Sequence, residues 1–279
     1  MMTAARFREL VGEFLGTFLL VLLGCGSVAV TVLFGAHQGL MQVALVWGVA
    51  VALAIYLTRH LSCAHLNPAV SVAMVLAGRM APGRLPLYVA SQLAGAIAAG
   101  GFLLILFGPS ISAFEQTNGI LRGSEASVKT AMLFGEFYPN PGMDAVVSLP
   151  LAMLVEAFGT FLLVLLIFSL TEGCNVGRPD DALAPAFIGL TVASIIALLA
   201  PLTQAGLNPA RDFGPRLVAW VGGWGDAAFP DRNGGFFWVY ILAPFVGAAL
   251  AALFFSKVLA PLLSAGTTGN PGKEGEDRS

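Results

Sequence analysis

Charge is scarce in this chain of 279 residues: Asp, Glu, Lys and Arg make up 11% of it, and hydrophobic residues make up 57%. A soluble domain carries about 25% charged residues, so the composition excludes an ordinary soluble fold and predicts an integral membrane protein. The formal net charge is −2 and the sequence has no run of basic residues, which argues against a nucleic-acid partner.

Cysteine and histidine are also rare. The three cysteines are too few, and too irregularly spaced, to predict a disulfide framework or a metal site; they are Cys25, Cys63 and Cys174. The three histidines form no zinc motif such as H-E-x-x-H and no pairing with a nucleophilic serine; they are His37, His60 and His65. We therefore expect no enzyme, with no catalytic residues, no bound metal and no cofactor.

Long apolar stretches are what the sequence does contain. Crossing about 30 Å of hydrocarbon takes roughly 20 helical residues, and stretches of that kind lie near 10–33, 39–58, 86–107, 149–170, 183–201 and 236–262. The first contains Glu13, runs too long for a signal peptide and lacks a cleavage region after it, so we expect it to remain in the mature protein. The sequence thus predicts an all-α membrane protein with six spans.

The basic residues indicate the orientation. Six spans place both termini on one side of the membrane, and most of the lysines and arginines fall on that side: Arg6, Arg8, Arg59, Arg79, Arg84, Arg178, Lys257, Lys273 and Arg278, against Arg122, Lys129, Arg216 and Arg232 on the other. The positive-inside rule therefore predicts that both termini are cytoplasmic. Residues 264–279, rich in Gly, Thr, Glu and Lys, are expected to form a disordered cytoplasmic tail.

The chain contains an internal repeat. G-E-F-L-G-T-F-L-L-V-L-L at 12–23 matches V-E-A-F-G-T-F-L-L-V-L-L at 155–166, and an Asn-Pro-Ala triplet also occurs twice, 141 residues apart. The two copies extend over about 8–107 and 149–262. Because each copy has three spans, an odd number, the second must enter the membrane from the opposite side. Inverted repeats of this kind place the functional site at their interface, near the membrane midplane.

Each triplet begins an apolar stretch, 67–78 or 208–220, that is too short to cross the membrane. Asn favours the N-cap of a helix and Pro the first helical position, so both stretches are predicted to be re-entrant half-helices. The non-helical backbone before each triplet is tolerated at membrane depth only against protein or water. We expect the half-helices to meet, N-terminus to N-terminus, beside an aqueous path. One triplet alone would suggest an ordinary turn. The six triplet residues are Asn67, Pro68, Ala69, Asn208, Pro209 and Ala210.

At these residues the chain resembles the major intrinsic protein family of aquaporins and aquaglyceroporins, and within it the glycerol uptake facilitators. The marks of that branch are N-P-A-R-D-F-G-P-R-L at 208–217, F-E-Q-T at 114–117 and Y-P-N-P at 138–141, the last two expected in a long insertion between spans three and four. The resemblance implies that residues 1–263 form one aquaporin-like domain, a right-handed bundle. It implies a passive channel for glycerol and other small uncharged solutes that excludes ions and protons.

The resemblance further implies a homotetramer in the lipid bilayer of a bacterial inner membrane, with a pore in every subunit. It assigns the narrow outer filter to Trp47, Ile196, Ala205 and Arg211. Typical glycerol facilitators have the same tryptophan and arginine, but glycine in place of Ile196 and phenylalanine in place of Ala205. This combination is more similar to plant nodulin-26-like channels, which pass glycerol, some water and small uncharged metalloid acids. Water, arsenite and boric acid therefore remain alternative solutes.

Other residues receive supporting roles. Backbone carbonyls before the triplets are expected to accept hydrogen bonds from the solute; they belong to Cys63, Ala64, His65, Gln204 and Gly206. The side-chain amides of Asn67 and Asn208 are expected to donate to a passing oxygen at mid-pore, where the positive ends of the two half-helices oppose cations.

Three acidic residues fall inside the predicted membrane region. Glu13 and Glu156 occupy matching positions in the two copies, and an intramembrane carboxylate can mark a proton relay. The family resemblance favours a structural role, in which each accepts hydrogen bonds from the re-entrant loop of its own half. Asp212 is expected to fix a loop, with an Arg211–Asp212 ion pair as the competing interpretation. A secondary transporter, which also uses inverted repeats, is a remote alternative because few ionisable groups could bind a coupling ion.

Overall fold

The computed structural model describes residues 3–229 and 234–268, and these contain helices but no strand. Six helical segments are long and apolar enough to cross a membrane, as predicted. The first five are α1 (Ala4–Phe34), α2 (Leu40–Ser62), α4 (Leu85–Thr117, preceded by the turn η1, Pro82–Arg84), α6 (Leu149–Thr171) and α7 (Ala184–Thr203). The sixth is a continuous series of η5 (Phe237–Leu242), α9 (Ala243–Phe254), η6 (Phe255–Leu259) and α10 (Ala260–Thr268).

Two short helices start at the triplets. They are α3 (Pro68–Leu76) and α8 (Pro209–Ala219), and each has the triplet asparagine as its N-cap. The Oδ1 atom of Asn67 accepts a hydrogen bond from the Ala69 amide at 2.8 Å, and that of Asn208 accepts one from the Ala210 amide at 3.1 Å. The predicted half-helices are therefore present, because Asn and Pro begin them as the capping preferences require.

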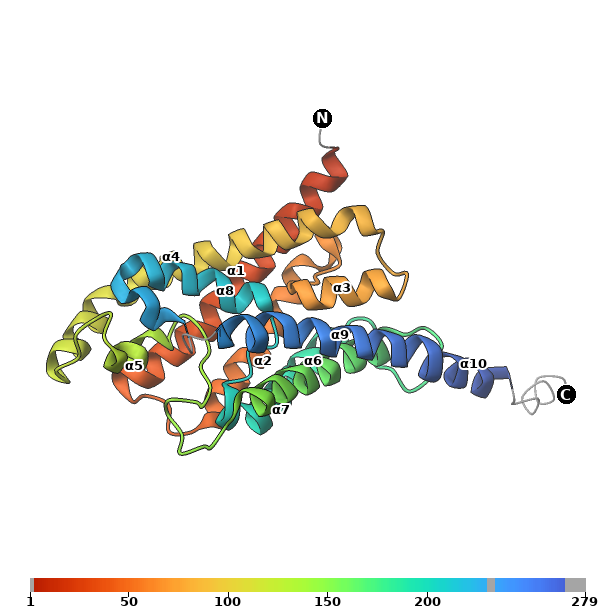
Figure 1. Ribbon diagram of the computed structural model, residues 1–279. Coiled ribbons are helices and arrows are strands. Elements are labelled where there is room, and N and C mark those ends of the chain that lie inside the picture. Colours follow the sequence, from red (N-terminus) through yellow and green to blue (C-terminus); the bar gives the residue numbers. More distant parts are fainter. Residues whose placement is uncertain (1–2, 230–233, 269–279) are drawn as a thin grey trace, which may run out of the picture.

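Each half-helix packs against the other copy of the repeat. The helix α8 lies along α4, and α3 lies along α9 (Figure 1). The second spans of the two copies, α2 and α7, also pack together, at a point where Gly48 and Gly189 bring the backbones so close that a Cβ on either would overlap the other's carbonyl oxygen. The all-α inverted repeat of six spanning helices and two half-helices is thus confirmed, and it interlocks its copies around both triplets.

The segment between α4 and α6 contains η2 (Glu125–Ser127) and α5 (Val128–Ala131), and lies at the left of Figure 1 near the turns after α8, η3 (Trp220–Trp224) and η4 (Gly225–Ala228). The predicted place of F-E-Q-T in this insertion is wrong, because residues 114–117 form the last turn of α4. The Glu115 carboxylate binds Arg122 and Thr130 there. These polar contacts extend the helix ten residues past the apolar stretch that was expected to end at 107.

The C-terminal boundary also differs from the expected one. Residues 264–268, assigned to a disordered tail, continue the helix α10, and the Ser264 hydroxyl donates to the Ala260 carbonyl at 2.9 Å within it. Composition alone missed this because α10 extends a helix that is already formed, so it needs no new nucleation. The rest of the expected tail, 269–279, lies outside the described residues.

Replacing Gly247 by alanine is expected to lower the free energy of unfolding by about 1–3 kcal/mol, since the new Cβ would overlap the Ala157 carbonyl where α9 crosses α6. The measurement is thermal unfolding in detergent. Gly101→Ala, in α4, is the matched control, because a Cβ there meets no atom within 4 Å. That control should be neutral or stabilise by about 0.5–1 kcal/mol. Equal unfolding midpoints for the two variants would contradict the close helix crossing.

Candidate functional site

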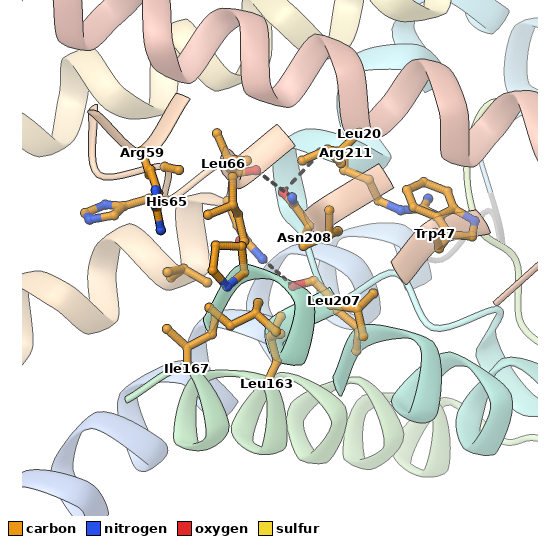
Figure 2. A pocket seen from close by; sticks show the side chains of 18 of the residues that line it. Leu20, Trp47, Arg59, His65, Leu66, Leu163, Ile167, Leu207, Asn208 and Arg211 are labelled. Atoms are coloured by element: carbon orange, nitrogen blue, oxygen red, sulfur yellow. Dashed lines mark hydrogen bonds between the residues drawn. The ribbon is translucent and has the colours of Figure 1, made fainter. Parts of the chain in front are cut away.

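Two cavities meet inside the bundle. The first, of about 280 Å³, contains both triplet asparagines in its wall and is called the central cavity. Figure 2 shows Arg59 and His65 at one end of it, Asn208 in the middle, and Trp47 and Arg211 at the other end. The second cavity, of about 420 Å³, is called the vestibule and lies beside the segment that joins α4 to α6. Trp47 and Ile196 line both cavities, so the two meet at these side chains.

The triplet asparagines connect the two halves of the repeat. The Nδ2 atom of Asn67 donates to the Leu207 carbonyl at 3.0 Å, and that of Asn208 donates to the Leu66 carbonyl at 2.8 Å. An amide NH₂ group has two hydrogens, so each asparagine keeps one for another acceptor in the central cavity. The sequence predicted that both amides donate to a passing solute oxygen. It did not predict that one hydrogen of each amide bonds to a carbonyl of the other repeat.

The backbone before each triplet is strained in the same way in both copies. Three of four residues before each triplet or next to it have positive φ. They are Cys63, Ala64 and Leu66 in the first copy, and Gln204, Ala205 and Leu207 in the second. Side chains disfavour this conformation by on the order of 1 kcal/mol or more per residue, and such strain tends to gather at functional sites. Because this conformation is not helical, the carbonyls of these segments do not take part in helical hydrogen bonds.

The five predicted carbonyl residues fall into two groups. Cys63, Ala64 and His65 line the central cavity, and their carbonyls accept no hydrogen bond from any residue that the structure describes. The Gly206 carbonyl accepts one from the Asn208 amide at 2.7 Å, which leaves only its second lone pair. Gln204 lines the vestibule, where its side-chain oxygen accepts from the Phe137 amide at 2.7 Å.

The four predicted filter residues come together from three helices, α2, α7 and α8, and from the segment that joins α7 to α8. Trp47, Ile196, Ala205 and Arg211 are each no more than 4% exposed, and all line the central cavity. The Arg211 guanidinium lies over the Trp47 ring, 4.0 Å from its centre, which is a cation–π arrangement. Gly24 makes room for that ring, because a Cβ there would overlap it. The place where the cavities meet therefore has an aromatic and aliphatic wall beside a fixed cation.

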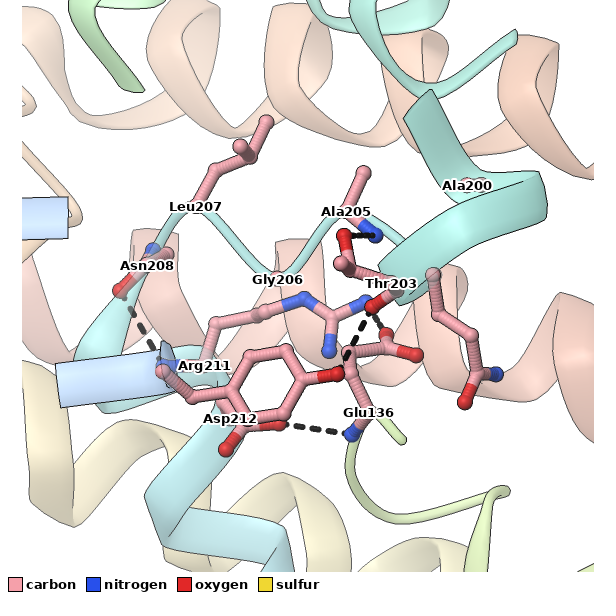
Figure 3. A network of polar contacts seen from close by, with 12 residues as sticks. Glu136, Ala200, Thr203, Ala205, Gly206, Leu207, Asn208, Arg211 and Asp212 are labelled. Atoms are coloured by element: carbon pink, nitrogen blue, oxygen red, sulfur yellow. Dashed lines mark hydrogen bonds and ion pairs between the residues drawn. The ribbon is translucent and has the colours of Figure 1, made fainter. Parts of the chain in front are cut away.

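The partner of that cation is Glu136, which sequence reasoning missed. The Nη2 atom of Arg211 forms an ion pair with Glu136 Oε1, as Figure 3 shows. Asp212 pairs instead with Arg216, at 2.7 Å, so the Arg211–Asp212 ion pair considered from the sequence is wrong. Asp212 also accepts from the Glu136 amide at 2.7 Å and thereby contacts the loop that carries this glutamate.

Glu136 is 3% exposed and lies in the loop between α5 and α6, at the wall of the vestibule. Burial raises the pKa of its carboxyl group to about 7, against the opposing influence of the Arg211 charge. A sequence signal existed: an acidic residue in the apolar segment M-L-F-G-E-F needs a buried cation, and Arg211 was the buried cation without an assigned partner.

The two intramembrane glutamates have equivalent contacts. Glu13 accepts hydrogen bonds from the amides of His65 and Leu66, at 3.0 and 2.8 Å. Glu156 accepts them from the amides of Gly206 and Leu207, at 2.9 and 2.8 Å. Both carboxylates are fully buried. Each therefore contacts the strained segment of its own half, and the geometry offers a structural reason for both.

Comparisons with known proteins agree with this architecture. The sequence profile of the family "Major intrinsic protein" matches residues 1–255. The chain is 42% identical over 251 residues to a glycerol uptake facilitator protein of Pseudomonas aeruginosa, covering 90% of this chain and 88% of that protein. It is 39% identical over 261 residues to the propanediol uptake facilitator PduF of Citrobacter freundii, covering 93% of this chain and 94% of that protein.

A solved structure extends the likeness to three dimensions. The X-ray structure of the aquaglyceroporin from Plasmodium falciparum superposes with a TM-score of 0.80 at 28% sequence identity, covering 93% of this chain and 99% of the other. The profile match spans nearly all of the helices described above, and the relatives exceed one third identity over most of their own length. The chain therefore belongs to the major intrinsic protein family.

Proposed function

We propose that this protein is a passive channel for glycerol and other small uncharged solutes. One observation carries the proposal: the N-termini of α3 and α8 meet at Asn67 and Asn208 in the wall of a cavity that continues to a vestibule. The names of the relatives, glycerol and propanediol uptake facilitators, support the same class of solute. Since downhill diffusion through such a path requires no coupling ion, the channel is passive.

The four residues where the cavities meet form the proposed selectivity filter. A polyol has a hydrocarbon edge and a hydroxylated edge, and Trp47 and Ile196 supply an apolar wall for the first. Arg211 supplies donors for the second that deprotonation cannot remove. The carbonyls of 63–65, which accept no hydrogen bond from the described residues, supply acceptors farther along the central cavity. Together these groups replace the hydration shell of a neutral hydroxyl compound.

Cations and protons are excluded at two levels. The N-termini of α3 and α8 each carry about half a positive elementary charge, and they face the same cavity. Arg211 adds a positive charge at the filter, although Glu136 offsets it. Aquaporin-type channels are a known example of exclusion by an arginine and half-helix dipoles. The carboxylates Glu13 and Glu156 act in this proposal as loop supports.

We further propose a homotetramer in a bacterial inner membrane with both termini in the cytoplasm. The distribution of Lys and Arg supports this orientation. A water channel or a metalloid-acid channel is the second candidate, favoured by one observation: small Ala205, beside Ile196, forms the filter wall where usual glycerol facilitators have phenylalanine.

Stopped-flow light scattering on proteoliposomes tests the proposal. Vesicles containing the protein should admit glycerol several times faster than protein-free vesicles, with no added conductance for protons. Glycerol entry at the protein-free rate would overturn the proposal, and rapid passage of water or boric acid alone would favour the second candidate. All solutes are measured on one vesicle preparation. A flux above the protein-free rate for any one of them therefore shows that the protein has inserted.

A thiol-modifying reagent is expected to reduce this flux several-fold by acting on Cys63. That cysteine is exposed and lines the central cavity, whereas Cys25 is buried. The measurement is glycerol entry before and after a small methanethiosulfonate reagent reaches both faces of the vesicle. Cys63→Ser should be insensitive. Cys174→Ser, the matched control, removes an exposed cysteine outside both cavities and should stay sensitive. Retained block in Cys63→Ser would contradict the position of Cys63 in the path.

A further inference from the structure

Gln204 ends the helix α7 in a conformation that disfavours side chains. Its φ is 60°, in the left-handed region, and it lies immediately before Ala205. Glycine or asparagine usually occupies such a helix end, because a Cβ in this conformation costs roughly 1–2 kcal/mol. Backbone strain of this kind tends to gather at functional sites. A long polar side chain kept at this position therefore indicates a role for the side chain itself.

The two polar atoms of the Gln204 side chain have different surroundings. The Oε1 atom accepts a hydrogen bond from the Phe137 amide at 2.7 Å, which fixes it against the loop between α5 and α6. Because an acceptor is required there, the NH₂ group occupies the other side. The Nε2 atom donates to no residue in the described part of the chain, and it is not one of the fully buried atoms without a partner. Since Gln204 lines the vestibule, its NH₂ group faces that cavity.

Hydrogen bonds to the end of α7 hold this donor in place. The backbone amide of Gln204 donates to the Ala200 carbonyl at 2.9 Å, and the Asn140 side chain donates to the same carbonyl at 2.7 Å. Asn140 also lines the vestibule, but its side-chain oxygen is already bound to the Gly142 amide at 2.9 Å. The Gln204 donor is thus positioned before a solute arrives, which lowers the entropic cost of binding.

Gln204 and Arg211 lie on opposite sides of the point where the two cavities meet. Trp47 and Ile196 line both cavities, whereas Gln204 lines the vestibule and Arg211 lines the central cavity. Figure 2 shows Arg211 beside Trp47 at this end of the central cavity. A linear solute that passes between Trp47 and Ile196 therefore has its leading end in the central cavity while its trailing end is still beside Gln204.

We propose that the Gln204 side chain is a specificity-determining group that selects linear polyols with a hydroxyl group at each end. Its NH₂ group donates a hydrogen bond to the trailing hydroxyl oxygen while the leading hydroxyl enters the central cavity. A methyl group in the trailing position excludes water from Nε2 and gives no hydrogen bond in return, which costs free energy. This inference rests on the proposed function and names the solute class within it.

The test compares two isomers of the same size, 1,3-propanediol and 1,2-propanediol, by stopped-flow light scattering on proteoliposomes. Protein-free rates are subtracted, and the readout is the permeability to the 1,3-isomer divided by that to the 1,2-isomer. The wild-type protein is expected to favour the 1,3-isomer, because in either orientation the 1,2-isomer presents its methyl group to one side of the narrow point. Gln204→Met keeps a side chain of similar length without the donor. Its ratio should fall about threefold to tenfold, the size expected for one lost hydrogen bond.

Gln204→Gly is the second variant, because glycine suits the left-handed conformation and enlarges the vestibule instead of keeping its volume. A fall of the ratio in both variants supports the inference, since they share the lost donor but differ in free space. Gln42→Met is the matched control. Gln42 also accepts a backbone amide, that of Gln38 at 2.6 Å, but it is exposed and lines neither cavity. Its ratio should equal the wild-type ratio.

Three results overturn the inference. The first is a wild-type ratio of unity or below, which needs no variant. The second is a wild-type ratio retained in either Gln204 variant. The third is an equal loss of water and both diols, which a merely structural role of Gln204 predicts. Wild-type vesicles that pass glycerol with a ratio of unity overturn the inference alone, whereas vesicles that conduct no polyol overturn the proposed function together with it.

Discussion

Replacing Arg211 by valine is expected to lower the free energy of unfolding by about 3–5 kcal/mol, because the substitution leaves the Glu136 carboxylate buried without its partner. Valine is the residue that the first repeat has at the matching position, Val70, so the side chain is compatible with the first turn of a half-helix. Arg216 cannot replace Arg211 as its partner, since Arg216 is already bound to Asp212 and to two carbonyls.

The double variant Arg211→Val, Glu136→Val separates the charge from the packing. Removal of both charges should recover most of the loss, since apolar replacement of a complete buried pair is often neutral. Thermal unfolding in detergent measures all three proteins, and Lys129→Val, an exposed cation at the vestibule, should change stability by less than about 0.5 kcal/mol. A double variant as unstable as Arg211→Val would show that the unpaired carboxylate is not the cause.

The fold was largely predictable because its strongest signals are local and repeated. Apolar length identifies a membrane span without any tertiary information. The matching segments at 12–23 and 155–166 then define two copies, and Asn67 and Asn208 mark the N-caps by their own preferences. The end of α4 was not predictable in this way, because its last turn depends on contacts of Glu115 with Arg122 and Thr130 rather than on apolar length.

The candidate site was predictable where spacing from the triplets determines position. Trp47, Ile196, Ala205 and Arg211 line one cavity, as the family pattern implies, although their role in selectivity stays a prediction. Glu136 was missed because it comes from a loop 75 residues away from Arg211 in the sequence, and no local pattern connects them. The hydrogen bonds from Asn67 to the Leu207 carbonyl and from Asn208 to the Leu66 carbonyl were missed for the same reason.

Glu156, the buried glutamate of the second repeat, is the subject of the other prediction with a large expected effect. Glu156→Ala is expected to lower the free energy of unfolding by about 3–5 kcal/mol and to abolish solute flux. The substitution leaves three buried donors without an acceptor, namely the amides of Gly206 and Leu207 and the Thr203 hydroxyl, which lies 2.6 Å from Glu156 Oε1. Flux is lost because the strained segment that carries Ala205 is then no longer held against the cavity.

Glu156→Gln distinguishes loop support from a proton relay. Glutamine retains one acceptor oxygen but offers an NH₂ group where a second acceptor is needed, so loop support predicts an intermediate loss of stability with no change in proton permeability. A relay predicts the reverse: nearly normal stability, with a proton flux in the wild-type protein that glutamine removes. Unfolding midpoints and a pH-sensitive dye inside the vesicles measure both. Glu9→Ala on α1, which removes only a partly exposed ion pair with Arg84, should cost less than about 1 kcal/mol. Because Glu13 binds the other strained segment in the same way, Glu13→Gln should repeat the intermediate result, and a normal midpoint there would contradict the equivalence of the two halves.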